Sequence, residues 1–444
     1  MKVLQLRTLL AVLVLLLLLV LPLSHGSGVA AVQSRSSSFA SSARTRSQAG
    51  ECGGDRSQSA PPAPPLPPGF SFAHPGVLVG ANTLADLKRH ADSGREPWAS
   101  ILTTARNTQW LKNYTASPRA TVECGSYDKP SLGCGDERRD AAAAYIHALL
   151  FAASGDVDTA HAAKAVEIMD AWSAVLRNHT NSNAPLQAAW AGAVFPRAAE
   201  IIRHSKFGGW PAARIERFES MLTSAFLPLV IDGCFGYNGN WELSMAEATM
   251  SIAVFTEDKA AMAVALQLWR GRVPGYFYLS SDGPTPLAPD NSPEGKESVV
   301  ANWHGQRVFR GHDGLCQETC RDMGHTQMGL ASAVNAAETA LHQGFDLYAE
   351  QATRLTAAME FHAKLALPNA SQAGTWLCNN AVKGIGHAGP TWEIAYNHFA
   401  NRRGLTNLSN TAAVVGVVRP TGVALQMVTE SLSHGDADMK TEDD

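Results

Sequence analysis

The residues best suited to chemistry lie between positions 316 and 330, in the stretch CQETCRDMGHTQMGL. This stretch contains Glu318, Arg321, Asp322 and His325 among small and apolar residues. On a helix these four side chains would fall at i, i+3, i+4 and i+7 and share one face. Because buried ionisable groups are costly unless they are paired or used, the cluster is either an ion-pair network or the wall of a cleft. We favour the cleft, because a long polar loop adjoins it.

A second candidate group is YNGNWELS, residues 237–244. Asn238 or Asn240 can cap the helix predicted to begin near Trp241, and an asparagine there can also aim its amide into a cleft beside the positive helix end. Trp241 is either a core residue or a platform on which a sugar ring stacks.

A third group is HAGPTWEIAYNHFANRRG, residues 387–404, with His387, Trp392 and Tyr396. Packing in the core is the default interpretation of its aromatic residues. A tyrosine phenol near cations can instead act as a general acid or base. Patterns typical of serine hydrolases, nucleotide-binding loops, zinc proteases and EF-hands do not stand out in the sequence.

The amino terminus has a basic head and a Leu/Val run from Leu9 to Leu23, followed by small residues. We predict a signal peptide over residues 1–26 and a secreted protein, periplasmic if bacterial, with no membrane contact after cleavage. A signal anchor is the alternative. Sequons at Asn113, Asn178, Asn369 and Asn407 predict glycosylation in a eukaryotic host. The net charge of −4 argues against nucleic-acid binding.

Seven cysteines in an oxidising compartment predict disulfide bonds. Cys124 and Cys134 bracket a Gly/Pro-rich loop and are the first predicted pair. Cys234 and Cys378 are candidates for long-range bonds, and Cys316 and Cys320 stand four residues apart. Cys52, in a linker, is the candidate for the unpaired residue. A zinc site of the paired CxxC type is absent from the sequence.

The domain organisation follows from composition. Residues 27–75 form a Ser/Arg-rich and then Pro-rich linker, residues 76–434 a single domain, and residues 435–444 an acidic tail. Within the domain, apolar residues recur at spacings of three and four, with capping residues at their starts and glycines at their ends. We predict an all-α fold of stacked helical hairpins, either an open superhelix or a closed toroid. The connections 232–241, 273–318 and 376–404 are expected to meet at one rim.

The order of NGNWELSMAEA, CQETCRDMGHTQ and PTWEIAYNHF resembles the alginate lyase superfamily of polysaccharide lyases. The resemblance covers roughly residues 80–430 and implies an α/α toroid that cleaves a uronate-containing polysaccharide by β-elimination. In that family an asparagine with an adjacent histidine, an arginine, and a tyrosine seven residues later form the site. Asn240 and Arg321 match the asparagine and the arginine. Trp241 and Met328 occupy the other two positions, so a divergent member is expected.

The predicted mechanism needs a group that neutralises the uronate carboxylate, a base for the C5 proton and an acid for the leaving oxygen. Asn240 and Arg321 suit the first task, His325 the second, and Tyr396 the third or an alternative base role. His304, Tyr278 and His387 are reserves, and no metal or other cofactor is required. The predicted substrate-binding residues are Trp241, Gln317, Glu318, His304, His387 and Trp392.

Two other functions fit the same residues. A glycoside hydrolase would use two carboxylates across a cleft, and the candidates are Glu242, Glu318, Asp322 and Glu393. A carbohydrate-binding protein without catalysis on the same fold is the second alternative, because the family histidine and tyrosine are missing. A lyase leaves an unsaturated sugar that absorbs in the near ultraviolet, whereas a hydrolase leaves only a new reducing end.

Overall fold

The computed structural model describes residues 62–107, 111, 114–234, 239–289 and 300–435, which are mostly helical. The first helices are α2 (Ala81–Ser93), α3 (Trp98–Arg106), α4 (Cys134–Ala153), α5 (Thr159–Val175), α6 (Ala184–Arg203), α7 (Ala212–Met221), α8 (Leu227–Val230), α9 (Gly239–Phe255) and α10 (Lys259–Tyr276). The later helices are α12 (Met323–His342), α13 (Leu347–Glu350), α14 (Ala352–Ala366), α15 (Glu393–Tyr396), α16 (Ser409–Val418) and α17 (Glu430–His434).

Short strands occur at two places. In the first sheet, β1 (Thr121–Cys124) pairs antiparallel with β2 (Ser131–Leu132) and parallel with β3 (Asn178–Thr180). In the second, β4 (Val423–Ala424) pairs antiparallel with β5 (Met427–Val428). Both are small additions to a helical body.

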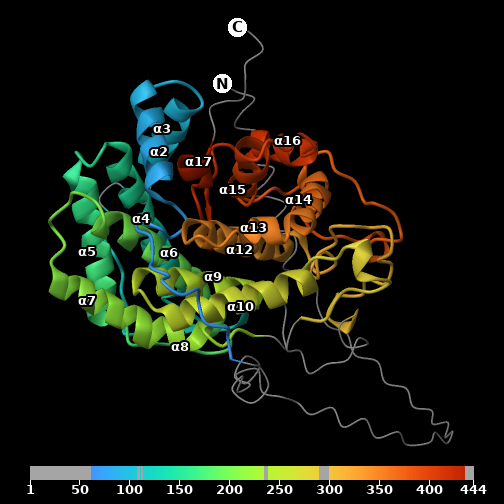
Figure 1. The fold of residues 1–444 in the computed structure, drawn as a ribbon, viewed down its shortest axis with the longest axis horizontal. Helices are drawn as coiled ribbons and strands as arrows, with labels where there is room; N and C mark the ends of the chain where they lie inside the picture. Colours follow the sequence, from blue (N-terminus) through green and yellow to red (C-terminus); the bar gives the residue numbers. More distant parts are fainter. Residues whose placement is uncertain (1–61, 108–110, 112–113, 235–238, 290–299, 436–444) are drawn as a thin grey trace, which may run out of the picture. The chain divides into compact units, whose positions relative to one another are not determined.

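Helices α4, α6, α9 and α12 pack side by side in that order and form an inner row. A second layer covers this row, in which α5 contacts α4 and α6, α8 contacts α6 and α9, α10 contacts α9 and α12, and α14 contacts α12. Figure 1 shows α9 between α12 and α10. The arrangement is the predicted stack of helical hairpins.

The inner row is buried because small and apolar residues occur on all its sides, and several of its few charged residues form ion pairs inside the core. Every residue of α9 is buried, and α6 is buried from Leu186 to Ile202. A helix without a polar face needs neighbours all round. The connections follow ordinary capping rules: Asp258 accepts hydrogen bonds from Ala260 N and Ala261 N at the start of α10.

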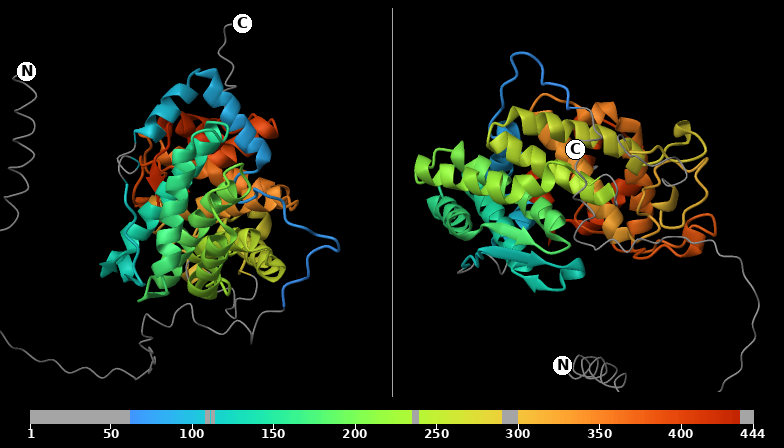
Figure 2. Two further views of the ribbon diagram at one scale, coloured as in Figure 1. Left: turned by 90° about the vertical axis from the view of Figure 1, so that its left-hand side faces the viewer. Right: turned by 90° about the horizontal axis from the view of Figure 1, so that it is seen from below.

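The long connection between α10 and α12 lies at one edge of the helical body. Figures 1 and 2 show its described part, in yellow and orange, at the opposite edge from α5 and α7. Arg354 of α14 forms an ion pair with Asp282 of this connection, with Nη1 2.7 Å from Oδ2. The connection is therefore held against the body.

Two helix predictions are wrong. The stretch from residue 316 is not helical as a whole, because α12 begins only at Met323 and Asp322 is its N-cap. The Asp322 side chain accepts a hydrogen bond from the backbone N of His325, and this N-cap sets the point at which the helix begins. The apolar spacing also predicts a last helix near residues 413–433, but α16 ends at Val418, since Pro420 cannot continue it. The chain then forms β4, β5 and α17.

The predicted Cys124–Cys134 disulfide is confirmed, and Cys378 does form a long-range bond, but its partner is Cys320. Cys234 is also disulfide-bonded. The free cysteine of the described chain is the buried Cys316. Cys52, the candidate for the unpaired residue, lies outside the described residues.

The amino-terminal boundary differs slightly from the prediction. Phe72 packs partly buried against the core, and Ala73 N donates to the side chain of Gln343 at 2.9 Å. The folded part therefore begins before residue 76. The predicted signal peptide, most of the linker, Asn113 and residues 436–444 lie outside the described residues. None of the helices in the described ranges combines the length and apolar character needed to cross a membrane.

A buried ion pair joins the inner helices to the β4–β5 hairpin. Arg197 of α6 pairs with Glu247 of α9, and both side chains are almost completely buried. Arg197 Nη1 also donates to the carbonyl oxygen of Gln426 at 2.8 Å, between β4 and β5. Asn335 of α12 donates to Glu247 Oε1 at 3.0 Å. One arginine thus fixes three elements.

We expect Arg197→Leu to destabilise the protein by about 3–5 kcal/mol, because a buried carboxylate would lose its counter-charge. The matched control is Arg270→Leu, which breaks a half-exposed pair with Glu350 and should cost about 1 kcal/mol or less. Urea unfolding followed by circular dichroism measures both. Equal losses of unfolding free energy in the two variants would contradict the structural role given to the buried Arg197–Glu247 pair.

Candidate active site

A cavity of about 760 Å³ opens beside the start of α12. Its walls come from the 3₁₀ turn Ser126–Asp128, α4, the first half of α6, the start of α9, residues 321–328, residues 389–391 and the β4–β5 hairpin. The lining residues with polar or aromatic side chains suited to a carbohydrate are Tyr127, Asp128, Arg138, Asn183, Trp190, Trp241, Arg321, Asp322, His325 and Gln327. Charged groups of both signs therefore face one space.

Arg321 is held at the wall by a buried carboxylate. Its Nη1 donates to Glu318 Oε1 at 2.8 Å, and Tyr276 donates its hydroxyl to Glu318 Oε2 at 2.8 Å. Glu318 is 0% exposed, whereas the Arg321 side chain is 21% exposed. Burial acts to lower the pKa of Arg321, but Glu318 and the Tyr127 hydroxyl outweigh it and raise that pKa. The guanidinium is therefore a fixed positive charge.

Asp322 and His325 form a dyad at the start of α12. Nδ1 of His325 lies 2.7 Å from Oδ2 of Asp322, and the backbone N of His325 donates to Oδ1 at 2.8 Å. Burial acts to raise the pKa of Asp322, but these bonds from His325 prevail and lower it to about 2. With Nδ1 engaged, Nε2 of His325 is left for a substrate.

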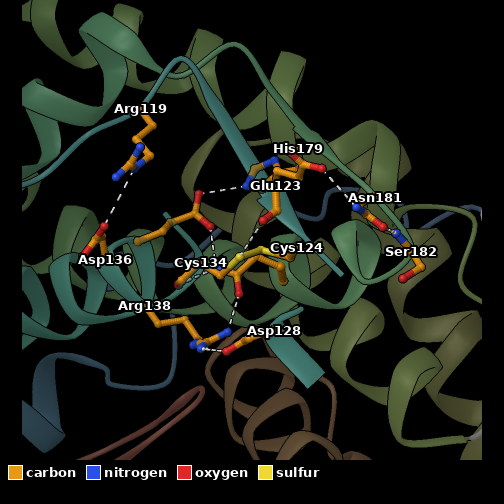
Figure 3. The surroundings of a disulfide bond; sticks show 12 residues. Arg119, Glu123, Cys124, Asp128, Cys134, Asp136, Arg138, His179, Asn181 and Ser182 are labelled. Atoms are coloured by element: carbon orange, nitrogen blue, oxygen red, sulfur yellow. Dashed lines mark hydrogen bonds and ion pairs between the residues drawn. A yellow bond between two sulfur atoms is a disulfide. The ribbon is translucent and has the colours of Figure 1, made fainter. Parts of the chain in front are cut away.

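Tyr127 reaches the cavity from a loop that the Cys124–Cys134 disulfide closes, shown in Figure 3. It has a φ of 55° and is 77% exposed. Its hydroxyl interacts with the Arg321 guanidinium. The loop is anchored to α4, because Arg138 Nη2 donates to Asp128 Oδ2 at 2.7 Å, and Figure 3 shows these two side chains pointing toward each other.

Arg138 and Trp190 add a second cationic and aromatic wall. The Arg138 guanidinium lies 5.4 Å from the centre of the Trp190 ring, and its Nη1 donates to Gln187 Oε1 at 2.6 Å. Tyr127, Arg138 and Trp190 were not among the predicted site residues. The predicted Cys124–Cys134 loop was the available signal, but nothing local indicates that it reaches α12.

Several predicted site residues do lie together. Arg321, His325 and Trp241 line the cavity, as does Met328 at the family's tyrosine position. Glu318 lies behind Arg321 and positions it rather than facing the cavity. Partial burial, followed by the charges of Arg321 and His325, lowers the pKa of His304, so this histidine lies near them without lining the cavity.

Other predicted residues do not reach the cavity. Asn240 is completely buried in α9 and is not part of the lining. Gln317 is buried as well, and its Oε1 accepts a hydrogen bond from Gly239 N at 2.8 Å. It thereby fixes the start of α9 beside Trp241. The Gln317 side chain therefore does not face the cavity.

The third predicted group belongs mostly to the core. Trp392 is 0% exposed, which excludes stacking on a sugar in this structure. Tyr396 is half-buried against the core and outside the cavity lining. His387 lines a separate hollow of about 400 Å³. Tyr278, a reserve candidate, is buried and donates its hydroxyl to the carbonyl oxygen of Gly283 at 2.6 Å.

Comparison with known protein families matches residues 134–372 to the family described as alginate lyase. The crystal structure of alginate lyase A1-III from Sphingomonas species A1 is similar, with 13% identity, a TM-score of 0.57, and coverage of 82% of this chain and 97% of that chain. A histidine-to-alanine variant of alginate lyase A1-III complexed with a tetrasaccharide matches at 14% identity, with a TM-score of 0.58 and coverage of 83% and 97%. No curated protein matches. The predicted α/α toroid is confirmed by this likeness.

We expect Asp322→Asn to remove a charge while keeping the cap, since asparagine caps helices equally well. The folded-state pKa of about 2 lies below the ordinary 3.8, so the stabilisation is complete above about pH 4 and lost as the pH falls toward 2. Because the side chain is partly exposed, the difference at pH 7 should be on the order of 1 kcal/mol. Urea unfolding of both proteins across this pH range tests it. A difference that persists unchanged down to pH 2 would contradict the dyad.

Proposed function

The chain belongs to the alginate lyase family and is a polysaccharide lyase, and we propose that it cleaves a uronate-containing acidic polysaccharide, of the alginate or glucuronan type, by β-elimination. The observation that carries the proposal is the position of Arg321. Its charge is fixed by Glu318 at the wall of a cavity that Tyr127 and His325 also line. A relative described as alginate lyase A1-III has been complexed with a tetrasaccharide, which supports a carbohydrate substrate.

The chemistry requires a cation at the carboxylate of the substrate. The C5 proton of a uronate becomes acidic only when the negative charge that develops on the adjacent carboxylate is stabilised. An arginine supplies that stabilisation through two parallel N–H donors, and its pre-set position makes it effective in the transition state. Arg321 is suited to this task because Glu318 and Tyr276 hold its orientation from behind.

His325 is the proposed base. Its Nδ1 is bound by Asp322, which orients the ring and stabilises the imidazolium that forms when Nε2 takes the C5 proton. The electron pair of the C5–H bond forms the C4–C5 double bond, and the C4–O bond breaks. The leaving oxygen then needs a proton.

Tyr127 is the proposed acid, in place of Tyr396. Its hydroxyl lies at Arg321, whereas Tyr396 is outside the cavity lining. A phenol beside a guanidinium can donate a proton to the leaving oxygen, because the positive charge stabilises the phenolate that remains. Trp241 and Trp190, which are mostly buried, form an apolar part of the cavity wall.

The glycoside hydrolase alternative has less support. It needs two carboxylates across a cleft, one of them protonated at working pH. Glu242 and Glu393 are buried in ion pairs with Arg272 and Arg419. Asp322 does line the cavity, but its pKa of about 2 makes it a poor acid.

We also propose that the protein is secreted and glycosylated. The disulfides fit an oxidising compartment. The sequon asparagines Asn178, Asn369 and Asn407 are all exposed, as an attached glycan would require. These observations agree with the signal peptide predicted over residues 1–26.

The first experiment measures near-ultraviolet absorbance of the unsaturated uronate while the protein is incubated with alginate, polymannuronate or glucuronan. We expect a rise with one polymer.

His325→Gln should reduce the rate about 10²- to 10⁴-fold, and Arg321→Lys should also reduce it, because lysine lacks the two-point contact. His387→Gln is the matched control and should keep the wild-type rate. New reducing ends without absorbance would favour a hydrolase, and binding without turnover would favour a carbohydrate-binding protein.

A second experiment compares two tyrosines. We expect Tyr127→Phe to lower kcat about 10²-fold or more while the melting temperature stays constant, because the hydroxyl is at the surface. Tyr396→Phe should leave kcat unchanged. The opposite ranking would return the acid role to Tyr396 and refute the assignment made from the cavity.

A further inference from the structure

A cluster of two histidines and two carboxylates lies outside the cavity, where the segment before α2 meets the end of α6. His74 Nδ1 is 3.0 Å from Glu200 Oε2, and His204 Nε2 is 3.6 Å from Glu200 Oε1. One ligand atom from each of the three residues lies within 4.8 Å of the other two. The ligands of one zinc ion, at about 2.0–2.2 Å from it, have mutual distances in the same range.

The charge of the cluster favours a cation. The Glu200 side chain is 0% exposed, and Glu257 Oε1 lies 3.7 Å from His74 Nε2. The nearest arginine, Arg203, is already paired with Glu219 at 2.7 Å. With neutral imidazoles, the buried Glu200 therefore lacks the full counter-charge that a buried carboxylate requires, whereas Glu257 is 62% exposed and solvated.

We propose that His74, Glu200 and His204 bind a divalent transition-metal ion of the zinc type. Two imidazole nitrogens and one carboxylate oxygen are a ligand set that zinc accepts, with a fourth position for water. Calcium and magnesium are disfavoured, because they prefer oxygen ligands alone.

The surroundings match those of a metal-binding histidine. Such a histidine usually presents its second nitrogen to a carboxylate or carbonyl. Glu257 is the carboxylate beside His74 Nε2, with Oε1 at 3.7 Å, which is an ion-pair distance rather than a hydrogen bond. The His74 and His204 rings are stacked, with centroids 4.4 Å apart and planes within 10°, so both rings approach Glu200 from the same side. His204 is partly exposed, which gives an ion access.

The ion would have a structural role. Leu186 lines the cavity near the start of α6, and His204 lies 18 residues further along the helix. At 1.5 Å per residue these two positions are about 27 Å apart, which is too far for the ion to take part in a reaction in the cavity. The site instead fastens the segment before α2, drawn in blue in Figure 1, to the end of α6. The same segment binds the end of α12, where Leu78 N donates to Thr339 Oγ1 at 3.1 Å. This inference is independent of the proposed lyase reaction.

The test uses the full chain, stripped with a chelator and titrated with Zn²⁺ by calorimetry and thermal unfolding. We expect one high-affinity ion per chain and a rise of several °C in melting temperature. His74→Asn and His204→Asn should each weaken binding by at least about 100-fold, since loss of an outer partner alone costs about 10- to 100-fold. Glu257→Gln should weaken binding about tenfold.

The matched control is His387→Asn, which removes an exposed histidine elsewhere and should bind zinc as the wild type does. The melting temperatures of the stripped variants report whether each one is folded. The proposal is overturned if zinc leaves the wild-type melting temperature unchanged. It is overturned equally if folded His74→Asn and His204→Asn bind zinc like the control.

Discussion

The fold depends on buried carboxylates that are neutralised by arginines from other parts of the chain. Each of four glutamates with almost no exposure has its own arginine partner: Glu247 with Arg197, Glu242 with Arg272, Glu338 with Arg402, and Glu393 with Arg419. Alanine-rich inner helices pack closely but offer little shape that would fix their mutual positions. A buried ion pair adds little net stability compared with apolar residues, but it penalises any arrangement in which a charge is unpaired. These pairs therefore select one packing of otherwise similar helices.

The candidate site contains the same kind of glutamate–arginine ion pair, with one difference. Glu318 is as buried as the other glutamates, but its partner Arg321 extends from it into the cavity. The carboxylate holds the guanidinium in place, and the exposed side of the guanidinium remains available for a substrate anion. The hairpin that closes the opposite wall is itself held by Arg197, through the carbonyl oxygen of Gln426. Structural and candidate functional arginines thus act on the same cavity.

The sequence predicts what is local and misses what is distant. Helical periodicity and the short Cys124–Cys134 loop are local, and both predictions are confirmed. Asp322 was wrongly placed inside a helix, because periodicity cannot reveal that its carboxylate caps the following turn. Trp392 is of a residue type that often binds sugars, and only the packing around the start of α15 shows that it belongs to the hydrophobic core. Tyr127 could not be found, since its approach to Arg321 joins segments almost 200 positions apart.

The divergence from the family pattern then has a physical explanation on the proposed mechanism. Elimination requires proton-transfer groups at fixed positions around the substrate carboxylate, and these groups can come from any chain position that reaches those points. Trp241 and Met328 line the cavity but cannot transfer protons. His325, in the first turn of α12, and Tyr127, from the disulfide-closed loop, both reach the same guanidinium region. The arginine is the fixed reference in this arrangement, because its position is set by a buried carboxylate, whereas acid and base can move to new segments without altering the helical core.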